Sequence, residues 1–386
     1  MKTNKIRLGE QCVVTSSKRF HLSERITQGV PFYCSKEIIK KFNGEDVTEC
    51  DYISEDLYKK VSNEFGVPKE NDLLITTRGT IGIPYLYKRT DRFYFADGNL
   101  TWIKDFDSNL YSKFLYYWFQ SYEGRKKFEA LAKGTAQKAV PISGIKTLEI
   151  ELPSLKSQKR IADILSAYDD LIENNQKQIK LLEEAAQRLY KEWFVDLRFP
   201  EHENTKIVDG VPEGWIKEEI GKIIKKVHRT KQIVASEYKD EGSIPIVDQS
   251  RAFVAGYTND LEARVDFGIP IIVFGDHTRI VKLIQFPFAK GADGTQLIIS
   301  DCLEMPQRLL YCSIMNVDLS NYHYARHFKY LKEEKIMIPT VKVANEFENN
   351  VTGIFSKIQN CRDEIIRCQK TRNLLLPKLM SGEVEA

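Results

Sequence analysis

Apolar residues follow a helical heptad pattern along two long stretches of the chain, each beginning just after a proline. Beyond Pro153, apolar side chains recur in alternating steps of three and four residues. The pattern returns beyond Pro339, which lies 186 residues further on, and it keeps its register without a gap. The sequence therefore predicts two long helices, over residues 157–194 and 345–376, each with an apolar face that needs a partner. The residues expected to form the core between them are Leu165, Ile172, Ile179, Leu182, Leu189, Ile354, Ile358, Ile365 and Leu375.

The predicted helices have readable ends and lengths. Ser157 is the expected N-cap of the first helix, and Pro200 lies beyond its end. Pro377 is expected to break or kink the second helix. At about 1.5 Å per residue, the helices would be about 57 Å and 48 Å long. The simplest partner for each apolar face is the other helix. An antiparallel pair would carry the two preceding globular parts to opposite ends, related by a pseudo-twofold axis.

Two polar residues interrupt the predicted core. Asn175 falls in the first helix and Arg372 in the second. A buried Asn can fix the register of a helix pair at a cost in stability. The alternative is that both residues lie where the pair opens toward solvent or toward another protein, and the sequence leaves both interpretations open.

The repetition extends upstream of the helices, with an offset that shrinks steadily toward the prolines. Short matching segments occur in the same order in both halves. They are Leu8-Gly9 with Ile220-Gly221 (offset 212), Leu73-Leu74-Ile75 with Ile271-Ile272-Val273 (198), and Ala96-Asp97-Gly98 with Ala292-Asp293-Gly294 (196). Since the offset falls from 212 to 186, the second copy is 26 residues shorter, which loop deletions would explain. The chain thus contains two copies of one arrangement, a globular part followed by a long helix.

Short runs of β-branched and aromatic residues predict strands within each globular part. The predicted strands are Leu73–Thr77, Arg92–Phe95, Thr101–Ile103, Ile244–Val247, Ile269–Phe274 and Leu297–Ile299. Ser112–Ala132 is predicted to be one helix, and the polar segment Phe199–Gly214 a linker between the copies. We predict an α+β fold with two mixed, strand-rich domains, linked by two long helices that form an antiparallel coiled coil. The expected boundaries are 1–152 and 200–338 for the domains, and 153–199 and 339–386 for the helices.

Composition narrows the class of protein. The chain has 386 residues, 42% hydrophobic and 29% charged, as expected for two or three globular domains. It contains no apolar run of 18 residues and no apolar signal region at its N-terminus, so we expect a cytoplasmic protein. The seven cysteines show no metal-ligand spacing. A net charge of +3 does not by itself indicate nucleic-acid binding, which must rest on local basic clusters.

The chain lacks the short motifs of common enzymes. It has no phosphate-binding G-x-x-x-x-G-K-[ST] loop, no G-x-G-x-x-G after a strand, no H-E-x-x-H, and no [ND]-P-P-[YF] segment to hold an adenine for methyl transfer. Glu333-Glu334-Lys335 resembles a nuclease cluster only weakly, and we interpret it as a solvated charge run. We therefore expect no catalytic residue, metal site or bound cofactor in this chain.

Basic and small polar residues gather at matching places in the two copies. The first place directly follows an apolar strand, where Gly lets the backbone approach a surface and Thr, His or Arg can donate to phosphates or base edges. The candidates for DNA contact there are Arg78 and Thr80 in copy one, and His277, Thr278 and Arg279 in copy two. A plain turn between strands is the alternative.

The second place lies shortly ahead of each of the two prolines. Arg and Lys suit guanine edges, and Gln suits adenine edges. The candidates there are Lys133, Thr135, Gln137 and Lys138 in copy one, and His323, Tyr324, Arg326, His327 and Lys329 in copy two. An ordinary surface loop is the alternative. A third cluster, with Gln249 and Arg251, occurs in copy two alone, and a basic run from Lys222 to Lys231 is either a phosphate patch or a solvated helix face.

Several segments together resemble those of a known family. They are Leu152-Pro153-Ser154-Leu155 with Gln158 and Ile161, the helix through Trp193-Phe194, Val211-Pro212-Glu213-Gly214-Trp215, and the ending Leu375–Glu383. In this order and spacing, the chain resembles the specificity subunit of a type I restriction–modification system over essentially its full length. Copy two departs from the pattern, because Ala344 stands where a matching Gln would lie and Arg372 interrupts the apolar face.

The resemblance implies two target recognition domains, each reading one half of a split double-stranded DNA site, with the helices as a spacer between them. It implies that this subunit is not catalytic and binds no cofactor itself. Two modification subunits would methylate adenine with S-adenosylmethionine, and restriction subunits would cut DNA with ATP and Mg²⁺. Two other hypotheses remain: a free-standing methyltransferase or nuclease, and a coiled-coil scaffold that binds only proteins.

Overall fold

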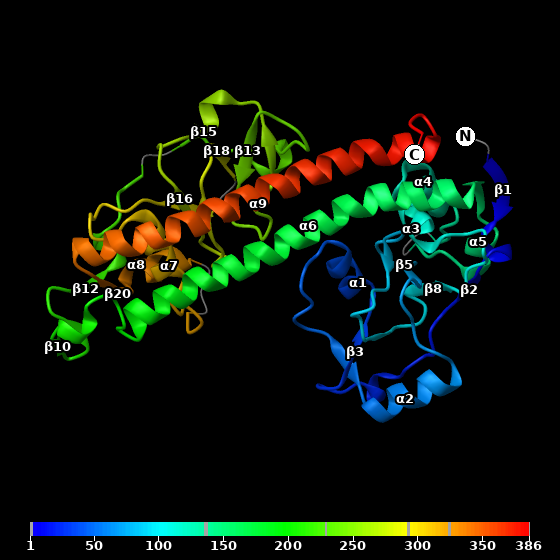
Figure 1. Ribbon diagram of the computed structural model, residues 1–386, viewed down its shortest axis with the longest axis horizontal. Helices are drawn as coiled ribbons and strands as arrows, with labels where there is room; N and C mark the ends of the chain where they lie inside the picture. Colours follow the sequence, from blue (N-terminus) through cyan, green and yellow to red (C-terminus); the bar gives the residue numbers. More distant parts are fainter. Residues whose placement is uncertain (1–2, 135–137, 228–229, 292–293, 323–325, 386) are drawn as a thin grey trace. The chain divides into compact units, whose positions relative to one another are not determined.

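The computed structural model describes residues 3–134, 138–227, 230–291, 294–322 and 326–385. The chain forms two compact units, Met1–Asn174 with Glu364–Ala386, and Asn175–Asp363. Each unit holds one strand-rich part and a portion of each of two long helices, α6 (Leu155–Tyr190) and α9 (Val341–Ser381) (Figure 1). The four-segment boundaries expected from the sequence, which set the helices apart from the globular parts, stay a prediction. Within the described ranges, no helix combines the length and the apolar composition that crossing a membrane requires.

In the first unit, an antiparallel sheet with the order β2-β8-β5-β6 carries the core. A second sheet, β4-β3-β7, contains a parallel pair, and β1 pairs with β9, which leads into α6. Leu73 and Ile75 of β5 share one hydrophobic cluster with Phe114 and with Leu165 of α6. The elements are β1 (Thr3–Arg7), β2 (Val13–Thr15), β3 (Val30–Tyr33), α1 (Ser35–Phe42), β4 (Asp51–Ile53), α2 (Glu55–Glu64), β5 (Leu73–Thr76), β6 (Pro84–Leu86), β7 (Tyr94–Phe95), β8 (Leu100–Lys104), α3 (Ser112–Gln120), α4 (Tyr122–Glu129), α5 (Ile142–Lys146) and β9 (Glu149–Pro153).

In the second unit, the sheet β17-β16-β19 carries the core, and β14-β13-β18-β15 again contains a parallel pair. β12 pairs with β20, which leads into α9. Ile272 and Phe274 of β16 share one hydrophobic cluster with Leu309 and with Phe347 of α9. The elements are β10 (Ile207–Val208), β11 (Val211–Pro212), β12 (Ile216–Glu219), β13 (Ile244–Val247), β14 (Gly256–Thr258), β15 (Arg264–Val265), β16 (Ile271–Gly275), β17 (Val281–Ile284), β18 (Phe288–Lys290), β19 (Thr295–Ile298), α7 (Gln307–Met315), α8 (His327–Glu333) and β20 (Lys335–Ile338).

The connections of the first unit recur in the second, and the structure explains the shrinking offset. The first residues of β3 and β13 are 214 positions apart, those of β4 and β14 are 205 apart, and those of β5 and β16 are 198 apart. These two reductions fall where the first unit has α1 and α2. A third reduction of the offset, from 195 between α3 and α7 to 186 between β9 and β20, falls where the first unit has α4. Copy two is shorter because its described residues contain no α-helix in these three places; only a short 3-10 helix, Leu261–Ala263, stands where the first unit has α2.

Both long helices differ from their predicted ends. The first begins two residues earlier than expected, because the hydroxyl of Ser154, and not that of Ser157, accepts a hydrogen bond from a first-turn N–H (Ser157 N, 3.2 Å). The second continues through Pro377 to Ser381. Pro377 and Asn373 are exposed, so the hydrogen bond that Pro377 cannot donate to the Asn373 carbonyl is missing on the solvent side of the helix. Leu379, on the opposite face, is buried in the core of the first unit and holds the end of the helix in place.

The two helices run antiparallel. In the first unit, Leu165 near the start of α6 clusters with Leu379 near the end of α9. In the second unit, Ala186 near the end of α6 clusters with Phe347 near the start of α9. The α+β class with two long antiparallel helices is therefore confirmed. Of the predicted core residues, those that the structure buries are Leu165, Ile172 and Ile358, and those that are partly buried are Ile179, Leu182, Leu189, Ile354, Ile365 and Leu375.

One smaller prediction about local structure was wrong, and one predicted linker contains more structure than the sequence indicated. The single helix expected over Ser112–Ala132 is two helices, because Ser121 has an extended backbone and its hydroxyl caps α4 through Gly124 N (3.1 Å). The segment Phe199–Gly214 is not a plain linker, since β10 and β11 form a hairpin in it. Asp209 and Gly210 both have positive φ (52° and 71°), as a tight two-residue hairpin turn requires.

Candidate nucleic-acid interface

In the first unit, hydrogen bonds join the turn after β5 to the loop ahead of α5. The N–H of Lys133 donates to the carbonyl of Ala139 (2.8 Å), and the N–H of Ala139 donates back (2.9 Å). Ala139 also forms a β-bridge with Arg78, and the N–H of Val140 donates to the carbonyl of Thr77 (2.9 Å). The structure thus brings together two segments that the sequence presented separately. Arg78, Thr80, Lys133 and Lys138 are all exposed there.

The second unit makes the corresponding junction through Asp276, at the end of β16. Its carbonyl accepts the N–H of His327 (2.9 Å), and its carboxylate accepts the N–H of Phe328 (2.8 Å), which satisfies two donors at the start of α8. Asp276 is itself buried. The turn after the central strand and the segment ahead of the long helix therefore meet in both units, but a side chain joins them in the second and a backbone bridge in the first.

A third segment in the second unit, Asp248–Ala252, packs against the same turn. The side-chain oxygen of Gln249 accepts a hydrogen bond from the backbone N–H of His277 (3.1 Å). The backbone carbonyl of Gln249 accepts one from the hydroxyl of Thr278 (2.7 Å). Beneath this segment, the ammonium of the buried Lys282 donates to the carbonyls of Asp248 (2.8 Å) and Ala252 (2.5 Å). Burial lowers the pKa of Lys282 to about 8. The structure places Gln249 beside the predicted turn and leaves Arg251 exposed next to it.

Individual candidates in the second unit differ in how far they are available to a ligand. His277, Arg326 and Lys329 are exposed. Arg279 is also exposed, but its guanidinium donates to the carbonyl of Leu319 (3.0 Å). The side chain of His327 is only 4% exposed, so it does not face the surface, and burial lowers the pKa of its imidazole. Burial in the helix start therefore argues against His327 as a DNA contact. The candidates Thr135, Gln137, His323 and Tyr324 lie outside the described residues.

The predicted basic run of copy two divides into two kinds of residue. Lys222 is paired with Glu218 (2.9 Å), and Lys231 with Asp260 (2.7 Å). Lys225 and Lys226 line a hollow of about 1160 Å³, and Lys225 also pairs with Asp301 (3.6 Å). His228 and Arg229 lie outside the described residues. The run is therefore neither one continuous phosphate patch nor one solvated helix face.

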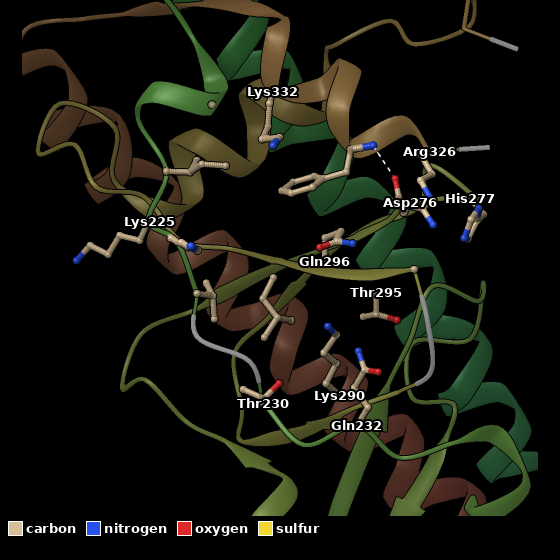
Figure 2. Close-up of a pocket in the computed structure, with 17 residues that line it drawn as sticks. Lys225, Thr230, Gln232, Asp276, His277, Lys290, Thr295, Gln296, Arg326 and Lys332 are labelled. Atoms are coloured by element: carbon tan, nitrogen blue, oxygen red, sulfur yellow. Dashed lines mark hydrogen bonds between the residues drawn. The ribbon is translucent and has the colours of Figure 1, made fainter. Parts of the chain in front are cut away.

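The hollow collects further polar side chains that sequence reasoning missed (Figure 2). Its lining contains His277 and Arg326 from the predicted segments. The further polar lining residues are Thr230, Gln232, Lys290, Thr295, Gln296 and Lys332. Thr230 and Gln232 lie at the end of the basic run and just after it, and the others come from the end of β18, from β19 and from α8, at positions that the sequence did not mark as candidates.

Charge in the hollow is strongly unbalanced. Five lining side chains are lysine or arginine, namely Lys225, Lys226, Lys290, Arg326 and Lys332. Among the described lining residues, Asp276 is the one carboxylate, and it is engaged with the start of α8. Such a surface attracts polyanions. Across the described ranges, no group of three or more His, Cys, Asp or Glu side chains is placed to hold a metal ion.

Comparison with known proteins shows what the chain is similar to. Residues 3–184 match the model of the type I restriction modification DNA specificity domain. The type I restriction enzyme MjaIX specificity subunit of Methanocaldococcus jannaschii is 29% identical over 71% of this chain and 69% of the relative. The chain is similar to the specificity subunits of type I restriction–modification systems. The resemblance inferred from the sequence is confirmed.

Two further similar proteins show how far along the chain the likeness extends. A putative type I restriction enzyme specificity subunit of Haemophilus influenzae is 28% identical over 48% of this chain and spans 45% of that relative. A solved S subunit of a type I restriction–modification system from M. genitalium has a TM-score of 0.59 and 17% identity, covering 98% of this chain and 96% of that chain. This last likeness is one of fold.

Proposed function

We propose that this chain is the specificity subunit, the non-catalytic DNA reader, of a type I complex, and that each strand-rich part reads one half of a bipartite site. One observation carries the proposal. In both units, hydrogen bonds bring together the two segments with exposed basic side chains, the turn after the central strand and the segment ahead of the long helix. Duplicated basic surfaces on a duplicated fold suit a target with two parts.

The proposal assigns the chemistry to partner subunits. Two modification subunits would transfer the methyl group of S-adenosylmethionine, and restriction subunits would use ATP and Mg²⁺ to translocate and cut DNA. The specificity subunit itself would bind double-stranded DNA and no cofactor. The antiparallel helices α6 and α9 would act as the spacer that sets the gap between half-sites.

Loss of single positive charges tests the proposed interface. The variants are Arg78→Ala and Lys138→Ala in the first unit, and Arg326→Ala and Lys329→Ala in the second, each in the assembled complex. Binding to DNA is measured over a range of salt concentrations. Each phosphate contact that is lost lowers the salt slope by about 1, whereas a lost base contact costs about 1–3 kcal/mol at one position. Lys59→Ala, an exposed lysine of α2 outside the two segments, is the control. Unchanged affinity and slope in all four variants would contradict the proposal.

Two experiments separate this function from its competitors. Robust turnover by the purified chain alone, given DNA with a methyl donor or with Mg²⁺, would identify an enzyme. A scaffold that binds only proteins would leave sequence-specific methylation unchanged after one strand-rich part is replaced by that of another specificity subunit. The DNA-reading function predicts instead that such a replacement changes one half-site and leaves the other as it was.

A further inference from the structure

The hollow of the second unit lies along an open edge of the central sheet. β19 is an edge strand of the sheet β17-β16-β19, whereas its counterpart β8 in the first unit is covered by β2. Near its end the edge is closed, because Ile224 bridges Ser300 and the N–H of Lys225 donates to the carbonyl of Ile299 (2.8 Å). Further along, Gln232 lies instead beside Lys290 of β18. The chain has therefore separated from β19, and the hollow opens between them.

The lining of this hollow has two chemical classes of side chain. Ammonium and guanidinium groups surround it, contributed by Lys225, Lys226, Lys290, Arg326 and Lys332. Two neutral amides, Gln232 and Gln296, lie among them. Figure 2 shows Gln296 in the middle of the hollow, with Lys332 on one side and Gln232 and Lys290 on the other. Cations suit the phosphates of DNA but carry no sequence information, whereas a primary amide can donate and accept at once.

Gln296 is positioned for such a double contact. Its place in β19 is fixed by pairing with Phe274 of β16, within a ladder of four residue pairs. Its side chain is half-buried, and its amide makes no hydrogen bond to any residue that the structure describes. An amide held on a regular strand loses little freedom on binding and can pair with N6 and N7 of adenine.

We propose that Gln296, supported by Gln232, reads base edges in the half-site of the second unit, while the surrounding lysines and Arg326 hold the phosphates. The inference rests on the proposed DNA-reading function and goes beyond it, because it names the sequence-determining residue. Gln296 lies outside the loops that the sequence marked as candidates. Its neighbours bind any DNA, and Gln296 selects one base pair.

The test compares Gln296→Ala with Lys226→Ala in the complex of the full-length chain with its modification subunits. Each complex selects DNA from a library that is randomised in both half-sites, and the selected sequences and the salt dependence of binding are measured. Gln296→Ala is expected to lower discrimination at one base pair of one half-site by tenfold or more, with the other half-site and the salt slope unchanged. Lys226→Ala is expected to weaken binding to all sequences alike and to lower the slope by about 1.

Two outcomes would overturn the inference. One is that Gln296→Ala leaves discrimination unchanged at every position, and the other is that it weakens all sequences alike, as Lys226→Ala does. Gln296→Met, which keeps the length of the side chain, replaces the Ala variant if that variant does not fold. If the proposed DNA-reading function itself were wrong, Lys226→Ala and Arg326→Ala would also leave the affinity for DNA and the salt slope unchanged. That result would overturn both proposals.

Discussion

Arg372 of α9 is ion-paired with Asp169 of α6 in the first unit. The second oxygen of Asp169 accepts the hydroxyl of Tyr117 in α3 (2.6 Å), so the carboxylate joins both long helices to the globular core. Burial raises the pKa of Tyr117, and the Asp169 carboxylate raises it further, which keeps the phenol protonated as the donor. Arg372, which the apolar pattern marked as an interruption, therefore makes a specific contact between the helices. Asn175, the other polar residue in the pattern, is buried.

Removing one partner of this pair should cost more than removing both. The side chains of Arg372 and Asp169 are 24% and 27% exposed, so either one left alone would be a poorly solvated charge. We expect Asp169→Leu to lower the free energy of unfolding by about 2 kcal/mol, and the double variant with Arg372→Leu to recover at least half of that loss. Urea denaturation of the full chain measures both. Glu184→Leu, which breaks an exposed pair with Arg188, is the control and should change stability by less than about 0.5 kcal/mol. Equal losses in the single and double variants would contradict this account.

Lys282 should make stability depend on pH in the alkaline range. The pKa of Lys282 is lowered from 10.5 to about 8, mainly by burial; the Asp248 carboxylate opposes this shift and the Arg362 guanidinium adds to it. Between these values the folded chain binds fewer protons than the unfolded chain, so the free energy of unfolding rises with pH. We expect the stability of the wild type relative to Lys282→Met to increase from pH 8 to pH 10.5, measured by urea denaturation at each pH. Lys357→Met, at an exposed lysine, is the control for the loss of one positive charge. If the stability of the wild type relative to Lys282→Met fell between pH 8 and pH 10.5, the lowered pKa of Lys282 would be refuted.

Replacing Gly294 by alanine should lower stability by more than its backbone conformation alone would explain. Its φ is +84°, and an added Cβ would lie 2.6 Å from the imidazole of His277 and 2.7 Å from the amide of Gln249. Gly268 has a similar φ of +68° but open space around it. We expect Gly268→Ala to cost about 1 kcal/mol from backbone strain, and Gly294→Ala about 2 kcal/mol, because the side-chain ends of His277 and Gln249 must also move and the hydrogen bond from His277 N–H to Gln249 is disturbed. Thermal unfolding of both variants checks this, and equal costs would show that the contact of Gly294 with the turn is not tight.

The proposed spacer role predicts a change in the recognised DNA. Helix α6 has no break between Leu155 and Tyr190, and α9 has none between Val341 and Ser381. One heptad inserted after Asn174, with a matching heptad after Asp363, adds about 10 Å to each helix. We expect methylated-site mapping to show a gap about three base pairs longer, or loss of methylation. Insertion of seven residues after Gly242, at an exposed turn of the second unit, is the control and should leave the gap unchanged. Full activity with an unchanged gap in the heptad variant would argue against a spacer.

Periodic features were predictable from the sequence, whereas features that depend on a single competing contact were not. The heptad pattern located both long helices, and the shrinking offset located a repeat whose missing parts turn out to be α1, α2 and α4. Pro377 was misjudged because its effect depends on whether the missing hydrogen bond lies on the solvent side of the helix, which one sequence does not reveal. Ser121 was missed because its hydroxyl can serve a helix interior or a cap, and the tight corner at Gly124 decides between them.

The sequence by itself determined that this protein is built twice, that two long helices need each other, and that basic segments occupy matching places in both copies. These properties follow from spacing along the chain, which local geometry converts directly into faces and repeats. Only the tertiary structure decided that the basic segments meet through Ala139 in one unit and Asp276 in the other, that His327 is buried, and that Gln296 stands in a hollow lined by lysines. Those relationships join residues far apart in the chain, and the packing of the sheets and helices, which no short pattern encodes, determines which side chains remain at the surface.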